Sequence, residues 1–188
     1  MILPFSTKFK NGTPTNFIHK IRMAVGCPYC DEIQDLSGMN ISKCNSCLHH
    51  AMFDPKLHTI REDKHDRWHA GRLIHPVVNN RSKNQFQFAP AFPCVSTQEI
   101  EVRHYSHETW CEPEMINAEY YDKKCGCNME RYYNVIVDGK MLKTDEVIKL
   151  SKNDGFASTN DFFSWFNPNN LEFLMRSEKI IHWTDLKY

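Results

Sequence analysis

Two closely spaced pairs of cysteines are the residues of this sequence best placed to do chemistry. Cys27 and Cys30 form one Cys-x-x-Cys pair, and Cys44 and Cys47 form a second one after a short polar loop. Each pair directs two thiolates toward one point, and two pairs complete the tetrahedral sulfur cage that zinc prefers. A redox pair would need only one such motif in a thioredoxin-like setting, which this sequence lacks. The spacing therefore predicts one zinc ion with a structural role, since four thiolates leave no position for water.

A second group of possible zinc ligands lies in the middle of the chain. Cys111, Cys125 and Cys127 are preceded by His104 and His107. Three thiolates and one imidazole could hold a second zinc ion, with His107 as the predicted fourth ligand, although the spacing alone does not choose between the two histidines. The alternative is a surface excursion with reduced thiols, because Cys-x-Cys is less diagnostic than Cys-x-x-Cys.

Composition and charge limit the classes of protein to consider. The chain has 188 residues, 41% of them hydrophobic and 24% charged, which predicts one globular domain with a substantial core. No apolar run approaches the ~18 to 20 residues that span a bilayer, and the first residues are too soon interrupted for a secretory signal. We therefore expect a cytoplasmic protein without a membrane partner. The net charge of zero provides no global field for nucleic acid, so such binding requires a local patch.

The elements that must position these residues are short and mixed. Hydrophobic periodicity, capping residues and turn residues predict where they lie. Helices are expected at residues 16–23, 144–152 and 160–166, and strands at 56–61, 73–78, 98–103, 132–137 and 179–184. Asp138 and Gly139 are typical of a tight turn after one of these strands. Several short strands with few helices in one domain predict an α+β fold built around a small mixed barrel.

Four short motifs follow one another along the chain. They are Lys56-x-x-Thr59-Ile60-Arg61, Trp68-x-x-Gly71, Asn153-Asp154-Gly155-Phe156-x-Ser158-x-x-x-Phe162 and Ile180-Ile181-His182-Trp183. This order resembles the ASCH domain family, whose members are relatives of the PUA-like fold. The resemblance covers most of the chain outside two insertions, at about 26–52 and 105–131, and each insertion holds one cysteine cluster. It implies a single domain over residues 1–188, a small PUA-like β-barrel with a few short helices and an inserted zinc ribbon.

The same resemblance implies a site that binds nucleic acid or a nucleobase. Some members of the family are amidohydrolases that deacylate cytidine on its exocyclic amine, with a catalytic lysine, a threonine three residues later and a glutamate further on. Lys56 and Thr59 match the first two positions, and Asp154 occupies the third. The aspartate departs from the family pattern because it reaches about one methylene less far, and catalysis is sensitive to misplacements on the order of 1 Å.

These residue types can support hydrolysis or ligand binding. A lysine in a lined cleft loses part of its preference for the charged form and can act as a base toward Thr59, while Asp154 orients the pair or shuttles a proton. Arg61 can stabilise an oxyanion or grip a phosphate, and Trp68, in a polar stretch, can stack on a base. Lys152 completes the predicted ligand-binding set. Taken singly, each of these residues also has a structural explanation, such as strand propensity, a turn or core packing.

Three hypotheses for the function follow. The first is a module that recognises RNA or a modified nucleoside in a cleft near Lys56. The second is an amidohydrolase that acts on acylated cytidine with Lys56, Thr59 and Asp154 as catalytic residues. The third is a protein-interaction adaptor that docks its partner through the zinc ribbon. Zinc is the cofactor expected in each case.

Overall fold

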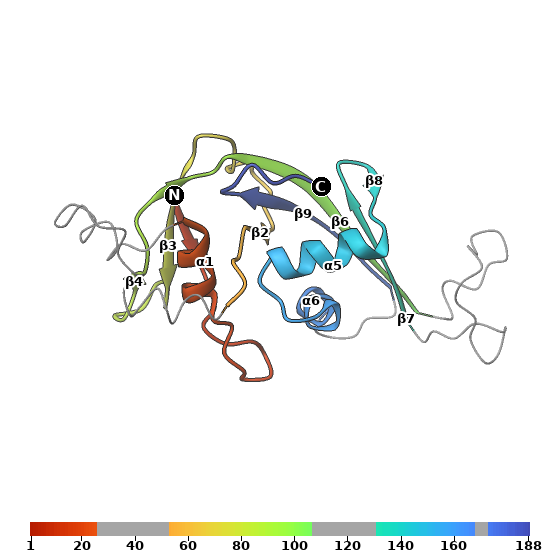
Figure 1. Ribbon diagram of the computed structural model, residues 1–188, viewed down its shortest axis with the longest axis horizontal. Coiled ribbons are helices and arrows are strands. Elements are labelled where there is room, and N and C mark those ends of the chain that lie inside the picture. Colours follow the sequence, from red (N-terminus) through yellow and green to blue (C-terminus); the bar gives the residue numbers. More distant parts are fainter. Residues whose placement is uncertain (26–52, 107–130, 168–172) are drawn as a thin grey trace, which may run out of the picture.

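The computed structural model describes residues 1–25, 53–106, 131–167 and 173–188 of the chain (Figure 1). The predicted zinc ligands lie outside these residues: Cys27, Cys30, Cys44, Cys47, His107, Cys111, Cys125 and Cys127. The two zinc sites therefore stay predictions. Within the described residues, no helix is long and apolar enough to cross a membrane.

A five-stranded antiparallel sheet forms the larger part of the fold (Figure 1). In spatial order its strands are β2 (His58–Arg61), β9 (Phe173–His182), β6 (Ser96–Ser106), β7 (Arg131–Val137) and β8 (Lys140–Met141). β9 and β6 pair along almost their whole length. Asp138 and Gly139 join β7 to β8 with φ angles of 48° and 80°, as a two-residue hairpin turn requires. The predicted turn is therefore confirmed.

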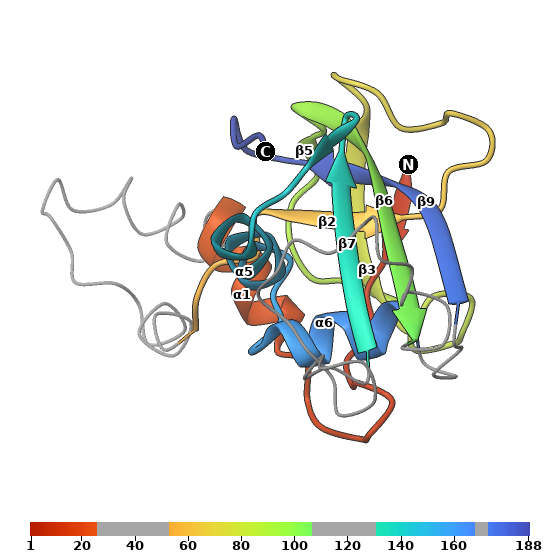
Figure 2. The same cartoon turned by 90° about the vertical axis from the view of Figure 1, so that its right-hand side faces the viewer.

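The described residues contain three helices, α1 (Phe17–Val25), α5 (Thr144–Asn153) and α6 (Thr159–Phe166). α6 begins after Ser158, whose hydroxyl accepts a hydrogen bond from the backbone N–H of Asp161 at 3.1 Å. α5 begins with the Glu146 carboxylate accepting a hydrogen bond from the backbone N–H of Lys143 at 2.8 Å. α5 and α6 pack against the same face of the five-stranded sheet (Figure 2), and so they bury one side of it.

A smaller sheet is built around β3, Leu73–Val78. β1 (Ile2–Pro4) pairs with β3 in parallel, while β4 (Phe86–Gln87) and β5 (Phe92–Pro93) pair with it in antiparallel fashion. β3, β4 and α1 lie at one end of the molecule and the β7–β8 hairpin at the other (Figure 1). The fold is mixed α+β, as predicted, but neither sheet closes into a barrel among the described strands.

Two hydrophobic clusters meet at β9. Ile180 belongs to the cluster that includes Leu150 of α5, whereas Ile181 belongs to the cluster that includes Ile21 of α1 and Ile74 of β3. Successive side chains of a strand point to opposite faces. β9 therefore contributes to both cores, and residues next to each other along it face different surroundings.

The eight predicted helices and strands are all present, with differences at their ends. Each of the three helices begins and ends within two residues of its predicted bounds. β9 begins at Phe173 and not at residue 179, and β2 begins at His58 and not at residue 56. The sequence does not predict β1, β4, β5 and β8, because two or three residues are too few to show an alternating pattern.

Candidate active site

The centre of the candidate site is an ion pair between Lys56 and Asp154, which we call the buried pair. Nζ of Lys56 lies 2.5 Å from Oδ1 of Asp154 and also donates a hydrogen bond to the backbone carbonyl of Asp154. Lys56 is 1% exposed and Asp154 is 3% exposed. The two residues are 98 positions apart in the sequence. The structure thus brings together two of the three residues that the family resemblance selects.

Lys56 is fixed by its backbone immediately before β2. Its N–H donates a hydrogen bond to the carbonyl of Lys20 in α1 at 3.0 Å, and its carbonyl accepts one from the indole Nε1 of Trp183 at 3.0 Å. The ring of Phe17, also in α1, has its centroid 4.7 Å from the Lys56 Nζ, a favourable distance for a cation–π contact. The ammonium group is therefore held by the surrounding structure and has no freedom to swing into solvent.

Asp154 occupies the C-terminal cap of α5. Its N–H donates a hydrogen bond to the Leu150 carbonyl at 2.9 Å, and Gly155 follows with a φ angle of +90°. A Cβ atom on Gly155 would lie 3.0 Å from the Phe17 ring and 3.2 Å from Cδ of Lys56. Glycine is therefore required here twice, for its left-handed conformation and for the close packing of the lysine stem.

Burial dominates the electrostatics of the pair. It lowers the pKa of Lys56 to about 8, against the opposing effect of Asp154. Burial also raises the pKa of Asp154, while the nearby Lys56 ammonium acts in the other direction. Both shifts disfavour the charged forms, so Lys56 releases its proton more readily than an exposed lysine does. A lysine that has released its proton can accept one from a reacting group.

His58 lies beside the buried pair on the first position of β2. Its Nδ1 is 3.7 Å from Oδ1 of Asp154, and its Nε2 shares a hydrogen bond of 2.8 Å with the hydroxyl of Tyr188. Asn153 donates a second hydrogen bond to that hydroxyl at 2.9 Å. Burial, followed by the neighbouring His182 and Lys56, lowers the pKa of His58 well below its ordinary value. The imidazole is therefore neutral at physiological pH.

Three polar side chains, which we call the histidine row, lie directly opposite one another across three strands. They are His58 of β2, His182 of β9 and Ser96 of β6. In the described chain, Nδ1 of His58, both ring nitrogens of His182 and Oγ of Ser96 are buried without a hydrogen-bond partner. Each such group costs roughly 1–3 kcal/mol of desolvation, so a cluster of them calls for an explanation. Sequence reasoning missed this row, which only the strand register reveals.

Thr59 is the third residue of the predicted catalytic set, and it faces away from the histidine row. It is buried and lies opposite Ile181 of β9, whereas its neighbours His58 and Ile60 point to the other face of the sheet. Among the described residues, no hydrogen bond joins the Thr59 hydroxyl to Lys56 or Asp154. The described structure therefore shows no hydrogen bond between this threonine and the buried pair.

The predicted ligand-binding residues differ in their surroundings. Arg61 donates hydrogen bonds to the carbonyls of Pro4 at 3.1 Å and Ile60 at 3.2 Å, and burial lowers its pKa. Lys152 is exposed near the end of α5. Trp68 is 3% exposed and belongs to the core beside α1 and β3, so the prediction of an exposed stacking platform is corrected. Its side chain belongs to a cluster with residues far away in the sequence, such as Ile21 and Ile74.

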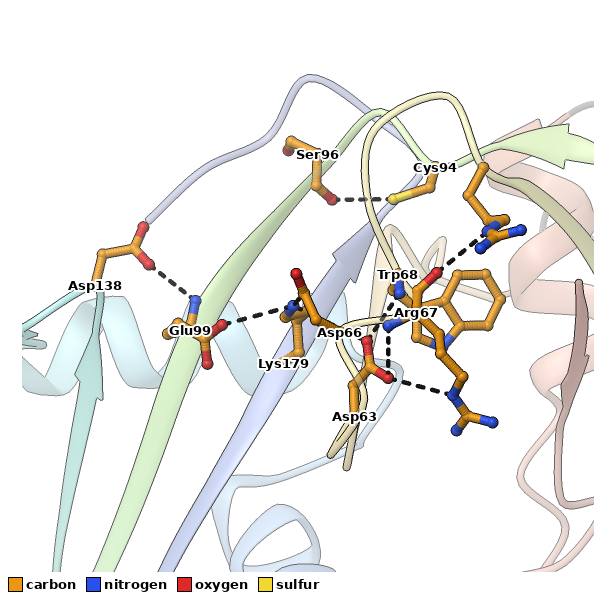
Figure 3. Close-up of polar contacts among 10 residues, drawn as sticks. Asp63, Asp66, Arg67, Trp68, Cys94, Ser96, Glu99, Asp138 and Lys179 are labelled. Atoms are coloured by element: carbon orange, nitrogen blue, oxygen red, sulfur yellow. Dashed lines mark hydrogen bonds and ion pairs between the residues drawn. The ribbon is translucent and has the colours of Figure 1, made fainter.

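A network of charges around Lys179 fastens the loop at residues 62–72 to the sheet (Figure 3). The Asp63 carboxylate accepts hydrogen bonds from the backbone N–H groups of Arg67 at 3.0 Å and Trp68 at 2.8 Å. Nζ of Lys179 donates a hydrogen bond to Asp66 and lies 3.7 Å from the Glu99 carboxylate. The Asp66 contact raises the pKa of Lys179. This lysine remains charged and serves as an attachment point.

Metal binding by the described residues is not indicated. Within residues 1–25, 53–106, 131–167 and 173–188, no three His, Cys, Asp or Glu side chains are arranged to hold a metal ion. Cys94, which lies in the described chain, is buried and its thiol donates to the Ser96 carbonyl at 3.4 Å.

A comparison of the whole chain with known proteins found no matching family model, curated protein or solved structure. The function is therefore inferred from the residues and their geometry.

Proposed function

We propose that this chain is an ASCH-type domain of PUA-like architecture that hydrolyses an acyl group from the exocyclic amine of a nucleobase, with acylated cytidine as the model substrate. The observation that carries the proposal is the buried pair. A lysine whose pKa is about 8, in contact with a single buried carboxylate, has the properties of a general base. The order of the motifs along the chain supplies the substrate class.

The shorter carboxylate is compatible with this proposal. Asp154 has one methylene less than the glutamate of the family pattern, yet its Oδ1 lies 2.5 Å from the Lys56 Nζ. Its position at the end of α5, next to Gly155, brings the backbone close enough to make up the difference. The departure from the family pattern therefore does not separate the two groups that must exchange a proton.

The proposed reaction uses water as the nucleophile, because no hydrogen bond joins the Thr59 hydroxyl to Lys56 or Asp154 among the described residues. Neutral Lys56 takes a proton from water, and the water oxygen bonds to the acyl carbon. The carbon–nitrogen bond then breaks, and the proton passes from Lys56 to the leaving amine. Since Lys56 is 1% exposed, substrate reaches it when a covering group such as the Phe17 ring moves aside.

Recognition of a nucleoside or RNA without turnover is the second candidate. It is favoured by the surroundings of Thr59, since among the described residues no hydrogen bond joins the hydroxyl that the family resemblance assigns to catalysis to the buried pair. A third candidate, the adaptor that docks a protein through the zinc ribbon, concerns residues outside the described chain. The zinc ions that would stabilise the two insertions are likewise proposed, because their predicted ligands also lie outside the described chain.

The test is hydrolysis of cytidine acetylated on its exocyclic amine. We expect Lys56→Met to lower kcat/KM by about 10²- to 10⁴-fold, the range typical for removal of a general base. Lys179→Met is the matched control and should retain activity. It removes a lysine whose pKa is raised, and not lowered, and which does not contact the buried pair. Turnover that survives Lys56→Met contradicts the proposal. Binding without turnover in the parent chain would support recognition alone.

A further inference from the structure

The side chain of Tyr188 lies in a slot beside the buried pair. Its hydroxyl contacts Nε2 of His58 at 2.8 Å and Nδ2 of Asn153 at 2.9 Å. Its ring lies edge-on to that of His58, with the centroids 5.4 Å apart, and 6.1 Å from the ring of His182. Gln98 accepts a hydrogen bond from the backbone N–H of Tyr188 at 3.0 Å and donates one to its backbone oxygen at 3.1 Å. Residues of β2, α5, β9 and β6 thus all contact this one aromatic residue.

His182, whose ring lies beside that of Tyr188, and Ser96, opposite His182 on β6, carry buried polar groups that Tyr188 does not satisfy. Both ring nitrogens of His182 and Oγ of Ser96 have no partner in the described chain, and Nδ1 of His58, 3.7 Å from Oδ1 of Asp154, makes no hydrogen bond there. Burial lowers the pKa of His182 to about 4 and that of His58 well below its usual range, so both rings are neutral. A neutral imidazole offers one donor and one acceptor, and a hydroxyl offers both. These groups match a ligand that also carries both kinds of group.

The burial of the slot restricts the charge of such a ligand. His58 and His182 are fully buried, and transfer of a charged group into such surroundings is strongly unfavourable unless an opposite charge meets it. The nearest pair of charges, Lys56 and Asp154, already neutralise each other. The seated ring of Tyr188 further indicates that the slot accepts a planar aromatic group. An uncharged, planar heterocycle fits all of these conditions.

We propose that this slot binds the edge of an uncharged nucleobase-like heterocycle, and that Tyr188 occupies it until the ligand displaces the tyrosine ring. The choice of a nucleobase rests on the proposed function, whereas the displacement rests on the contacts alone. Residues 184–188 follow β9 and contain no helix or strand, so they can move without disrupting either sheet. The ligand would take over the hydrogen bonds of the tyrosine hydroxyl and satisfy the histidine row as well.

The experiment is isothermal titration of the full chain with cytidine. Tyr188→Ala removes the competing ring, so we expect cytidine to bind at least about tenfold more tightly than in the parent. Tyr188→Phe is the matched control, because it keeps the ring and the Gln98 clamp but loses the hydroxyl, and it should give a smaller gain. Adding Ser96→Ala to Tyr188→Ala removes one member of the histidine row and should reverse the gain several-fold.

Each outcome decides the matter in one direction. Equal or weaker cytidine binding in a folded Tyr188→Ala chain overturns the proposal, and if that variant does not fold, equal or weaker binding in Tyr188→Phe does so. A gain that Ser96→Ala leaves unchanged also overturns it. Hydrolysis of acetylated cytidine is measured in the same samples. Tighter cytidine binding without hydrolysis of acetylated cytidine supports the slot and contradicts the proposed enzyme. Hydrolysis with a KM that Tyr188→Ala leaves unchanged contradicts the slot and supports the enzyme.

Discussion

Lys56, just before β2, and Lys179, within β9, both contact carboxylates, yet their pKa values move in opposite directions. Lys56 has one partner, Asp154, whose side chain is 5% exposed, and burial lowers the pKa of the lysine to about 8. Lys179 faces Asp66 and Glu99, whose side chains are 82% and 67% exposed, and it lies 3.9 Å from Asp63, whose side chain is 1% exposed. The hydrogen bond to Asp66 is the largest influence on Lys179, and it raises the pKa.

The difference shows that burial of the lysine itself, and not the mere presence of a carboxylate, decides whether its pKa falls. Carboxylates that keep their water stabilise an ammonium with little desolvation, so Lys179 stays charged and fastens the loop at residues 62–72. Burial of Lys56 disfavours its charged form by more than the contact with Asp154 favours it. Only Lys56 can therefore release its proton near neutral pH, and this makes it the better candidate for a base.

The largest difference between the two lysines should appear in the free energy of unfolding when each one is replaced. Lys56→Met leaves Asp154 buried without its partner, and we expect the free energy of unfolding to fall by about 4 kcal/mol. Lys179→Met should lower it by less than about 1 kcal/mol, because Asp66 and Glu99 are largely hydrated and the buried Asp63 keeps its hydrogen bonds to the backbone of Arg67 and Trp68. Urea unfolding of both variants gives the comparison.

A double variant distinguishes an uncompensated charge from lost packing in that experiment. Lys56→Met combined with Asp154→Leu removes both charges, and it should recover most of the stability that the single change loses. If Lys56→Met and Lys179→Met lower the free energy of unfolding by similar amounts, the burial of the pair does not make its charges costly to separate.

The two lysines should also affect the pH dependence of stability with opposite signs. The folded chain binds a proton at Lys56 less tightly than the unfolded chain does, so unfolding takes up a proton between about pH 8 and pH 10.5. The free energy of unfolding should therefore rise with pH across this window, by on the order of 3 kcal/mol from Lys56. The raised pKa of Lys179 acts the other way, and its stabilisation is lost as the pH rises through the folded value.

The measurement is the difference in stability between the parent chain and Lys56→Met at several pH values from 7 to about 10.5. That difference should change by on the order of 3 kcal/mol across the window, while the difference for Lys179→Met stays constant until the pH exceeds 10.5. A flat difference for Lys56→Met would mean that the lysine keeps its ordinary proton affinity despite its burial.

Local sequence patterns predicted the regular elements because their causes are local. The alternation at residues 98–103 lies within β6, and the Asp138-Gly139 turn lies where a left-handed turn is needed. β1 has three residues and no alternation, and it exists because β3 offers it a parallel partner. The burial of Trp68 has the same origin, since a side chain in a polar stretch is buried by distant elements that no local pattern reveals.

The site could be predicted only in part. Lys56 and Asp154 were selected by the order of family motifs, since no spacing rule connects residues so far apart in the sequence. The separation of Thr59 from the histidine row could have been foreseen, because neighbouring positions of a strand face opposite sides and Thr59 follows His58 directly. The row itself depends on which residues of β2, β9 and β6 lie opposite one another, and this register is set by the whole sheet.

Two glycines in the left-handed region provide the finest test of how tightly Lys56 is enclosed. Gly155 has a φ of +90°, and a Cβ there would meet the Phe17 ring and the Lys56 stem, whereas Gly139 has a φ of +80° and nothing within 4 Å. Gly155→Ala should lower the free energy of unfolding by about 2 kcal/mol, and Gly139→Ala by about 1 kcal/mol from backbone strain alone. Urea unfolding of the two variants measures the difference, which reports the packing around the lysine because the strain is common to both. Equal losses would mean that Phe17 and Lys56 yield freely to a methyl group, and then the ammonium is less firmly positioned than a general base requires.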